Sequence, residues 1–489
     1  MAKVVSSFEL SLNHRSRGQT LANWLYSELR ASILEGRLKA GAKLPASRDF
    51  ACLYQISRGT VVAAFERLQD EGYLSSRVGV GTRVNAVVPK REVVSRSSSE
   101  VPGYVRRVVS GYKHPKPFVG WVSLTGQRPF KMSDPDLAAF PAELWGRIAA
   151  RHARAYRSWL RREDDGCGYR PLREAIANYL GSSRGVRCQA DQVVIVSGTQ
   201  QALDLLARVL VKAGDPVWME DPGYFGASIA FGRAGAEIIP VPVDEEGVSV
   251  SAGIDACSNA KGVFLTPAHQ YPLGITLSLE RRMEILNWAS HKGAFVIEDD
   301  YDSEYRFEGL PAPALQGLDR NSNVIFVGSF TKLLFPALRL GYVVLPPSLV
   351  EVFVAFRRST DFRSSGMDQA VLNDFIADGH FGRHLRRMRG LYAERLAALV
   401  HYGQRYLTGI LEISNSKAGL YTVAFLRNGM ASRQAESLAA AKGLETRALD
   451  RFCLKRSDPK GLLLGFAAFD EKAIRAGVIQ LASALSRAR

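Results

Sequence analysis

Two hydrophobic patterns follow each other along the chain. From residue 18 to residue 85, apolar positions recur at the spacing of an amphipathic helix, and Leu21, Leu25 and Leu29 share one stripe. From residue 119 to residue 489, short runs of consecutive apolar and β-branched residues alternate with amphipathic stretches. The first pattern predicts a small helix-rich unit, and the second predicts a larger α/β unit.

The small unit contains three helical patterns and a hairpin pattern. "TLANWLYSELRASILEG" predicts one helix, "LPASRDFACLYQ" a second with Ser47 as N-cap, and "ISRGTVVAAFERLQDEGY" a third with Ser57 as N-cap and Gly72 near its end. "YLSSRVGVGTRVN" predicts a β-hairpin with Gly79 and Gly81 at the turn. Two short helices joined by a tight turn are typical of a helix-turn-helix.

A helix-turn-helix predicts where DNA is contacted. The first residues of the second helix of the pair meet base edges in the major groove, and here they are Ser57, Arg58, Gly59 and Thr60. Arginines that flank a hairpin turn suit contacts with phosphates. The candidate DNA-binding residues are Ser47, Arg48, Ser57, Arg58, Thr60, Arg77, Gly81, Thr82 and Arg83.

The large unit is expected to contain a mostly parallel sheet with helices on both faces. Its strand-like runs are "QVVIVSG", "PVWME", "AEIIPVPV", "GVFLTP", "AFVIED" and "NVIFVGS". Apolar strands separated by helices are typical of that architecture. Residues 86–118 carry basic residues, serines and prolines without periodicity, as linkers do. We therefore expect a DNA-binding domain at residues 14–85, a linker at 86–118 and a large domain at 119–489.

Charge and cysteine content add constraints. The net charge is +16, and residues 1–110 hold 17 Lys and Arg against 9 Asp and Glu. This asymmetry fits a polyanionic partner at the N-terminal unit, and ordinary solubility charge explains it equally well. The five cysteines are scattered without a CxxC pair or a Cys/His cluster, and no stretch has the pattern of a signal peptide or a membrane span. We expect a cytoplasmic protein without a structural metal.

Lys332 stands in an unusually apolar run, "VIFVGSFTKLLFPALRLG". Burial lowers the pKa of a lysine, and a neutral amine can form a Schiff base with an aldehyde. Ser329 and Arg339 flank the lysine and suit an anion such as phosphate. An aldehyde that also carries a phosphate is pyridoxal phosphate. Taken alone, the run fits a lysine that extends past apolar neighbours to solvent equally well.

Two further stretches suit the same ligand. "FVIEDDYDSEYRF" ends a predicted strand in three acids, residues 298–300, and Tyr301 follows. A carboxylate there can pair with a pyridinium nitrogen, and the tyrosine could reach a ring oxygen. "VIVSGTQQALDL" places Gly198 and Thr199 at the start of a helix, where backbone N–H groups suit a phosphate. Taken alone, the first stretch is better interpreted as a solvated acidic loop and the second as a plain strand–turn–helix.

Two turns complete the set of candidate ligands. Tyr224 in "MEDPGYFG" could stack on a flat ring. His269 and Gln270 in "LTPAHQYPLG" could touch the ring or its substituents. A structural role stays open for each of them, and for His269 alone it is the preferred interpretation.

Both units resemble known families. "LPASRDFA", "SRGTVVAAFERLQDEGYL" and "GVGTRV", in this order, resemble the winged helix-turn-helix of the GntR family. The five pieces of the large unit resemble the fold type I aminotransferases. Over nearly its full length the chain resembles the MocR/GabR subfamily of GntR-type regulators, in which a linker joins a winged helix domain to an aminotransferase-like domain. "RPFKMSDPDLAAFPAELW", "GYRPLREAIANYL" and "GLLLGFAAF" also match subfamily landmarks.

The resemblance implies roles for particular residues. Lys332 is the implied Schiff-base lysine, Asp299 the partner of the pyridine nitrogen, Tyr301 the partner of the ring oxygen and Tyr224 the residue stacked on the ring. The implied phosphate ligands are Gly198, Thr199, Gln200, Ser329 and Arg339. The subfamily also implies a head-to-tail homodimer, and two reading heads imply double-stranded operator DNA with repeated half-sites.

Two departures from the aminotransferase pattern weaken the case for efficient transamination. Aminotransferases carry Asn-Pro-Thr-Gly where this chain has "YPLG", so Tyr271 replaces the asparagine that contacts the ring oxygen. They also bind the substrate carboxylate with an arginine on a late strand, where "LLLGFAAF" offers Gly465. Arg447 or Arg451 could substitute for that arginine as an effector ligand.

These inferences combine into one functional hypothesis. We expect a transcriptional regulator that binds pyridoxal phosphate at Lys332 and senses an amine or amino acid, which displaces the lysine as an external aldimine and alters operator binding. Two alternatives stay open. One is an active aminotransferase with a DNA-binding appendage, and the other is a regulator that senses pyridoxal phosphate itself in the control of vitamin B6 synthesis.

Overall fold

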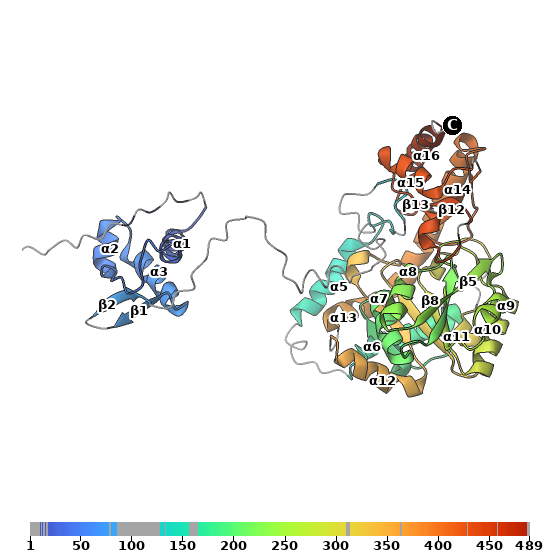
Figure 1. Ribbon diagram of the computed structural model, residues 1–489, viewed down its shortest axis with the longest axis horizontal. Coiled ribbons are helices and arrows are strands. Elements are labelled where there is room, and N and C mark those ends of the chain that lie inside the picture. The colour runs from blue at the N-terminus through green and yellow to red at the C-terminus, as the bar shows by residue number, and fades with distance from the viewer. Residues whose placement is uncertain are drawn as a thin grey trace, which may run out of the picture. The chain divides into compact units, whose positions relative to one another are not determined.

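The chain forms two compact units, residues 1–115 and 116–489 (Figure 1). The computed structural model describes residues 10, 12, 15, 18–77, 80–85, 128–132, 134–155, 165–309, 313–361, 364–427, 429–456 and 458–486. The expected linker at 86–118 lies outside the described residues, as do residues 14 and 119, so the expected domain boundaries stay a prediction. Within the described part of the chain, no helix is long and apolar enough to cross a membrane.

The small unit is a helix-turn-helix followed by an antiparallel hairpin, as the sequence predicts. Its elements are α1 (Leu21–Leu34), α2 (Ser47–Leu53), α3 (Arg58–Asp70), β1 (Leu74–Arg77) and β2 (Gly81–Val84). The apolar stripe of α1 is buried through Leu25 and Leu29, which pack into one cluster with Phe50 of α2 and with Val61 and Leu68 of α3. Burial of this shared stripe holds the three helices together.

The ends of the helices confirm one predicted cap and correct another. Ser57 caps α3, and its Oγ accepts a hydrogen bond from the backbone N–H of Thr60 at 3.1 Å. The prediction that Ser47 caps α2 is wrong, because the helix begins at Ser47 and its N-cap is Ala46, which has no side-chain oxygen to offer. Gly72 follows α3 with φ +77°, a conformation that glycine adopts without steric cost.

The large unit is built on an eight-stranded sheet in the order β3-β10-β9-β8-β7-β4-β5-β6. The strands β5, β4, β7, β8 and β9 pair in parallel, whereas β10 is antiparallel to β3 and β9, and β6 is antiparallel to β5. The predicted mostly parallel sheet is therefore confirmed. The strands are β3 (Val193–Val196), β4 (Pro216–Asp221), β5 (Glu237–Asp244), β6 (Gly247–Val248), β7 (Gly262–Leu265), β8 (Phe295–Asp300), β9 (Val324–Ser329) and β10 (Gly341–Val344).

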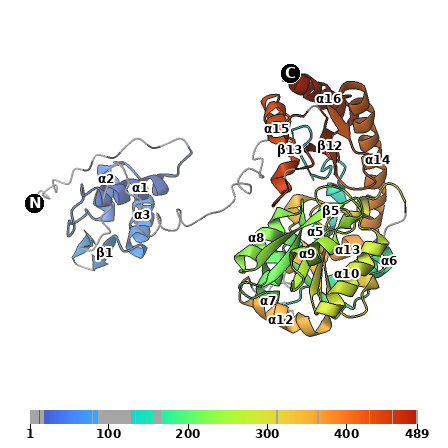
Figure 2. The same ribbon diagram turned by 45° about the vertical axis from the view of Figure 1, so that its right-hand side comes forward.

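Both faces of this sheet are covered because successive strand residues point in opposite directions. Val194 and Val196 pack into a cluster with α7, α8 and α12, whereas Val193 and Ile195 pack into a cluster with α6 and α13 on the other face. Farther along the sheet, α7 and α8 lie on one side and α10 on the other (Figure 2). The helices are α5 (Ala142–Arg154), α6 (Arg170–Arg184), α7 (Thr199–Leu210), α8 (Phe225–Arg233), α9 (Val250–Ala256), α10 (Leu279–Lys292), α11 (Leu315–Leu318), α12 (Pro347–Arg358) and α13 (Gly366–Ala377).

The C-terminal part adds a second, antiparallel sheet in the order β11-β12-β14-β13. Its elements are β11 (Leu411–Ile413), β12 (Tyr421–Leu426), β13 (Arg447–Ala448) and β14 (Gly461–Gly465), with α14 (His380–Tyr406), α15 (Ser432–Ala441) and α16 (Glu471–Ser486). It is tied to the end of β4, because the carboxylate of Asp221 accepts hydrogen bonds from three successive backbone N–H groups of residues 454–456. These contacts bring the second sheet to the carboxyl ends of the parallel strands.

Candidate functional site

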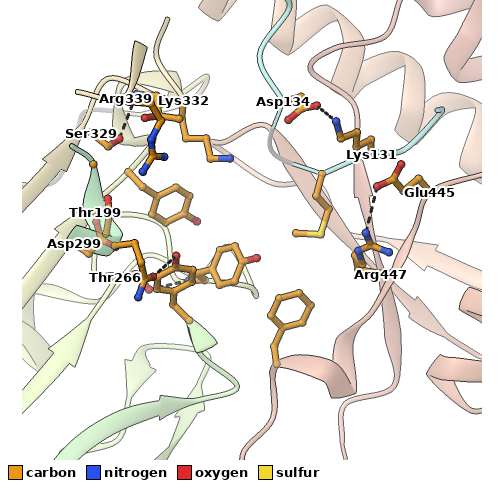
Figure 3. Close-up of a pocket in the computed structure, with 18 residues that line it drawn as sticks. Lys131, Asp134, Thr199, Thr266, Asp299, Ser329, Lys332, Arg339, Glu445 and Arg447 are labelled. Atoms are coloured by element: carbon orange, nitrogen blue, oxygen red, sulfur yellow. Dashed lines mark hydrogen bonds and ion pairs between the residues drawn. The ribbon is translucent and has the colours of Figure 1, made fainter. Parts of the chain in front are cut away.

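A cavity of about 440 Å³ lies between the carboxyl ends of the parallel strands and the second sheet (Figure 3). This is the edge at which open α/β sheets bind ligands, and the volume suits a small molecule. The predicted cofactor ligands that line it are Gly198, Thr199, Gln200, Tyr224, Asp299, Tyr301, Ser329, Lys332 and Arg339. The chain thus brings together residues that lie up to about 140 positions apart in the sequence.

The three acids at the end of β8 have different surroundings. Glu298 accepts hydrogen bonds at 2.9 Å from the backbone N–H groups of two residues of α11, and Asp300 forms an ion pair at 2.8 Å with Arg184. Asp299 points the other way, as strand alternation requires, and lines the cavity. Its Oδ1 is buried without a hydrogen-bond partner among the described residues. Of the three acids, Asp299 is the one presented to a ligand.

Asp299 is buried among other acidic residues. Burial, followed by the charges of Asp300, Asp302 and Glu220, raises the pKa of its carboxyl well above the ordinary value. A buried carboxyl in this situation is stabilised by a hydrogen-bonding cation that approaches it. The site is therefore suited to a positively charged ring nitrogen opposite Asp299.

Lys332 follows the end of β9 and extends across the cavity toward the second sheet (Figure 3). Burial lowers the pKa of its amine, and the charges of Asp134 and Asp302 partly offset that shift. In the same turn, Ser329 Oγ accepts a hydrogen bond from the backbone N–H of Thr331 at 3.2 Å. The local sequence thus gives a half-buried amine with enhanced nucleophilic character.

The anion-binding candidates converge beside the start of α7. Gly198 has φ +108° and precedes the helix, whose first backbone N–H groups are available for an anion. The Arg339 guanidinium lies next to Gly198: a Cβ atom built on Gly198 would be 3.7 Å from it. Ser329 and Thr199 line the same part of the cavity. A helix N-terminus, a hydroxyl and a guanidinium together suit a phosphate.

Aromatic rings enclose the cavity around Tyr271. Its ring packs edge-on against Tyr224, Tyr301, Tyr421 and Phe452, with centroids 5.4–5.8 Å apart. The Tyr224 hydroxyl donates a hydrogen bond to Gln200 at 3.2 Å, and burial raises the pKa of both Tyr224 and Tyr271. Tyr271 therefore fills the place of the expected asparagine with a packed, neutral ring.

His269 is the predicted cofactor ligand that does not line the cavity. Its Nδ1 lies 2.9 Å from Asp302 and 3.2 Å from the Tyr301 hydroxyl, which itself donates to the His269 carbonyl at 2.9 Å. The Tyr301 hydroxyl is also 3.1 Å from that of Tyr421. His269 therefore contacts the Tyr301 hydroxyl from outside the cavity and can orient the Tyr301 side chain that lines it. Gln270 is bound to backbone carbonyls of Pro222 and Tyr271 and has a structural role.

The cavity also contains residues that the sequence motifs did not single out. Thr266 donates to buried Glu220 at 2.7 Å and accepts from the backbone N–H of Tyr271 at 2.8 Å, and burial raises the pKa of Glu220 to about 8. The other unpredicted lining residues are Lys131, Met132, Asp134, Thr331, Glu445 and Phe452. Several come from segments without a recognisable ligand motif, so only the folded chain identifies them.

The two effector arginines proposed from the sequence have different positions. Arg447 lines the cavity and pairs with Glu445 at 3.3 Å. Arg451 is not among the lining residues and pairs with Glu436 at 2.7 Å. Arg447 is therefore the one of the two that a ligand in the cavity can meet.

The candidate DNA-binding residues lie at the starts of α2 and α3 and in the hairpin. Arg48, Arg58, Arg77 and Arg83 are exposed, and Arg83 also donates a hydrogen bond at 3.0 Å to the backbone carbonyl of Gly41. The hydroxyls of Ser57 and Thr60 lie 2.9 Å apart at the start of α3. The remaining candidates lie at the first residue of α2 (Ser47) and in β2 (Gly81 and Thr82).

Comparison with solved structures places the large unit among the aminotransferases. The kynurenine aminotransferase of Pyrococcus horikoshii, solved in complex with PMP, is 26% identical with a TM-score of 0.69 and covers 82% of this chain and 97% of its own. The family model for aminotransferase class I and II matches residues 164–467. The large unit therefore has the aminotransferase class I and II fold.

The complete domain combination recurs in bacterial regulators. The family model for bacterial regulatory proteins of the gntR family matches residues 21–84. The probable rhizopine catabolism regulatory protein MocR of Rhizobium meliloti is 40% identical over 94% of this chain and 92% of its own. The pyridoxine biosynthesis transcriptional regulator PdxR of Corynebacterium glutamicum is 29% identical over 94% of this chain and 95% of its own. The chain belongs to the MocR type of GntR-family transcriptional regulators, in which an aminotransferase-like domain follows the DNA-binding domain.

Proposed function

We propose that this regulator binds pyridoxal phosphate in the cavity at Lys332. We further propose that its affinity for operator DNA changes when a small amine or amino acid enters that cavity. One observation carries the proposal. A half-buried lysine and a buried carboxyl without a hydrogen-bond partner among the described residues line one cavity in a chain that begins with a gntR-type DNA-binding domain. The first two features suit the cofactor, and the third suits regulation rather than metabolism.

The residues present fit the cofactor. Asp299 would meet the pyridine nitrogen, whose positive charge compensates the environment that raises the pKa of this carboxyl. Tyr301 would meet the ring oxygen and Tyr224 the face of the ring. The phosphate would lie at the start of α7 with the ligands Gly198, Thr199, Gln200, Ser329 and Arg339. When bound, the cofactor supplies an aldehyde that condenses with amines and a ring that accepts electrons.

Lys332 gives the site its responsiveness to amines. Because burial lowers the pKa of Lys332, more of its amine is unprotonated near neutral pH than in solvent. An effector amine can take its place, after which the lysine side chain is released into the cavity. His269 holds the Tyr301 hydroxyl in position from behind during the exchange.

The response of the DNA-binding unit requires two states with different affinities for the effector. We propose a head-to-tail homodimer in the cytoplasm, in which each DNA-binding unit rests on the large unit of the partner chain. Entry of the effector would favour one arrangement of the two DNA-binding units of the dimer over another. Operator half-sites would then be bound, released or bent.

A second candidate has a specific observation in its favour. PdxR, a relative over nearly the whole chain, is named for pyridoxine biosynthesis, and this name favours the cofactor itself as the second candidate signal. In that case operator affinity changes with pyridoxal phosphate alone and is indifferent to added amines. An active aminotransferase, by contrast, would convert an amino donor rapidly and turn over a keto acid, which absorbance spectroscopy detects.

The DNA-binding half of the proposal is tested with Arg58→Ala. If Arg58 reads a base, the variant weakens binding to an operator selected from random-sequence DNA by about 1–3 kcal/mol. Arg37→Ala is the control, since it removes an arginine of the same unit that pairs with Glu35 at 2.9 Å. Equal losses for both variants, or no loss for Arg58→Ala at low salt, would remove Arg58 from the interface.

A further inference from the structure

The wall of the cavity opposite the candidate cofactor ligands carries two ion pairs. Lys131 Nζ lies 2.6 Å from Asp134, and Arg447 lies 3.3 Å from Glu445. All four side chains line the cavity, and both pairs face Lys332 across it (Figure 3). Among the described residues of this wall, each cation thus has a carboxylate partner that is itself presented to the ligand.

The sequence resemblance implies that Gly465 takes the place of the arginine that binds the substrate carboxylate in aminotransferases, and the backbone around Gly465 leaves no room for a side chain. Gly465 ends β14, and its backbone N–H donates at 2.9 Å to the carbonyl of Phe130. A Cβ added at Gly465 would lie only 1.9 Å from the carbonyl oxygen of Lys131, so no larger side chain fits there without moving the backbone. The same backbone segment delivers Lys131 and Met132 to the cavity. An arginine at this position is therefore excluded by the main chain itself.

Arg447 is a poor substitute for that arginine. Its guanidinium already pairs with Glu445 at 3.3 Å and lies 3.7 Å from Glu436. An incoming carboxylate would have to compete with Glu445 for Arg447, on a wall that also carries the negative charge of Asp134. Like charges brought together out of water are strongly unfavourable, so the wall discriminates against a carboxylate.

A hydroxyl group fits the same wall without this conflict. A hydroxyl donates one hydrogen bond and accepts others, so it can bond to both members of an ion pair without separating them. The carbon skeleton of such a ligand would lie along Met132, Tyr271 and Phe452, which also line the cavity. The wall therefore favours a neutral, hydrogen-bonding group over an anion.

We propose that the effector is an amine that carries hydroxyl groups in place of a carboxylate, such as an amino alcohol or an amino sugar. Its amine takes the place of Lys332, so this inference rests on the proposed function. Its hydroxyls bond to the Lys131–Asp134 and Arg447–Glu445 pairs on the opposite wall.

The test uses matched ligands that differ in one group. Serinol and serine share an amine and a hydroxymethyl group, and serinol has a second hydroxymethyl group where serine has the carboxylate. Glucosamine extends the hydroxylated series. The full-length protein loaded with pyridoxal phosphate is titrated with each, and both the absorbance of the cofactor and the Tm of the protein are followed. We expect serinol or glucosamine to change both at concentrations at least about tenfold below those needed for serine. Equal or tighter binding of serine would overturn the inference.

A variant tests the wall directly. Glu445→Gln keeps the shape of the side chain and removes the carboxylate that neutralises Arg447, so the preference for hydroxylated amines over amino acids should fall by about tenfold or more. Glu412→Gln is the control, because it breaks an exposed Glu–Arg pair with Arg427 on the same sheet, outside the cavity. An unchanged preference in Glu445→Gln would contradict the assigned role of the pair.

Failure of this inference can be distinguished from failure of the proposed function. If amino acids act and hydroxylated amines do not, the cavity is an amine sensor with another specificity, and only the inference is overturned. If neither class changes the absorbance of the loaded protein, the amine-sensing function itself is wrong, and the inference falls with it.

Discussion

The two walls of the cavity differ in how closely they follow an aminotransferase. The wall at the strand ends presents an amine, a buried carboxyl and a guanidinium, from Lys332, Asp299 and Arg339, and these groups suit pyridoxal phosphate. The opposite wall lacks room for a side chain at Gly465 and presents paired charges such as Arg447 with Glu445. This difference supports the proposal that the cavity detects a ligand rather than turning it over.

The largest expected effect is a difference in Schiff-base absorbance between variants of the two lysines that line the cavity, Lys332 and Lys131. Lys332→Ala should abolish the Schiff-base absorbance that appears when pyridoxal phosphate is added, because the variant has no amine at that position. Lys131→Ala, on the opposite wall, should retain the band. Absorbance spectra of both purified variants check this. Persistence of the band in Lys332→Ala would show that another residue forms the Schiff base.

A matched pair of acids gives the next effect. Asp299→Asn replaces a charge-assisted hydrogen bond to the pyridine nitrogen with a neutral one, so affinity for pyridoxal phosphate should fall by roughly 10- to 100-fold. Asp134→Asn removes a carboxylate from the other wall and should change that affinity by less than about threefold. Equilibrium titration with the cofactor measures both. Equal losses of cofactor affinity in the two variants would contradict the assignment of cofactor binding to the wall that carries Asp299.

Glu220 predicts how stability depends on pH on the cofactor side. Burial raises its pKa to about 8 in the folded chain from an ordinary value of 4.5, so the folded state holds a proton that the unfolded state has released between these values. This contribution is complete below pH 4.5 and is lost as pH rises toward 8. Relative to Glu220→Gln, the wild-type free energy of unfolding should therefore fall with rising pH, by at most about 1.4 kcal/mol per pH unit. Denaturant unfolding at several pH values measures the slope. Parallel curves would mean that Glu220 is ionised in the folded protein.

The smallest expected effect concerns the residue at which the walls meet. Tyr271 packs edge-on against rings from both sides, namely Tyr224 and Phe452. Tyr271→Phe preserves that packing and should change the free energy of unfolding by less than about 1 kcal/mol. Thermal unfolding of the cofactor-free protein is the measurement. A larger loss would show that the hydroxyl, rather than the ring, holds the walls together.

The wall at the strand ends was largely predictable from the sequence, and the opposite wall was not. Asp299 lies at the end of one recognisable apolar strand and Gly198 follows another, and such strand ends lie at the edge of a sheet where ligands bind. Lys131 and Asp134 belong to no such pattern, and they reach the cavity because their segment pairs with Gly465, more than 300 residues away. The sequence exposes Gly465 as a departure, but only the folded chain reveals which backbone occupies the space.

Smaller differences have equally local reasons. Ser47 is a good N-cap by composition, yet α2 begins one residue earlier than that role requires. The sequence identifies three acids at the end of β8 without ranking them by geometry, and strand alternation together with Arg184 then separates Asp299 from Asp300. His269 has the chemistry of a ligand and lies behind Tyr301, a distinction that depends on tertiary packing.

The most direct test measures whether an amine that enters the cavity changes the affinity for operator DNA. Operator affinity of the full-length protein loaded with pyridoxal phosphate is measured with and without an effector amine, in the wild type and in Lys332→Ala. We predict that the amine shifts the wild-type Kd by about fivefold or more and leaves the variant unchanged, because the proposed coupling passes through Lys332. An equal shift in both proteins, or a wild-type protein that turns over a keto acid while its operator affinity stays constant, would contradict it.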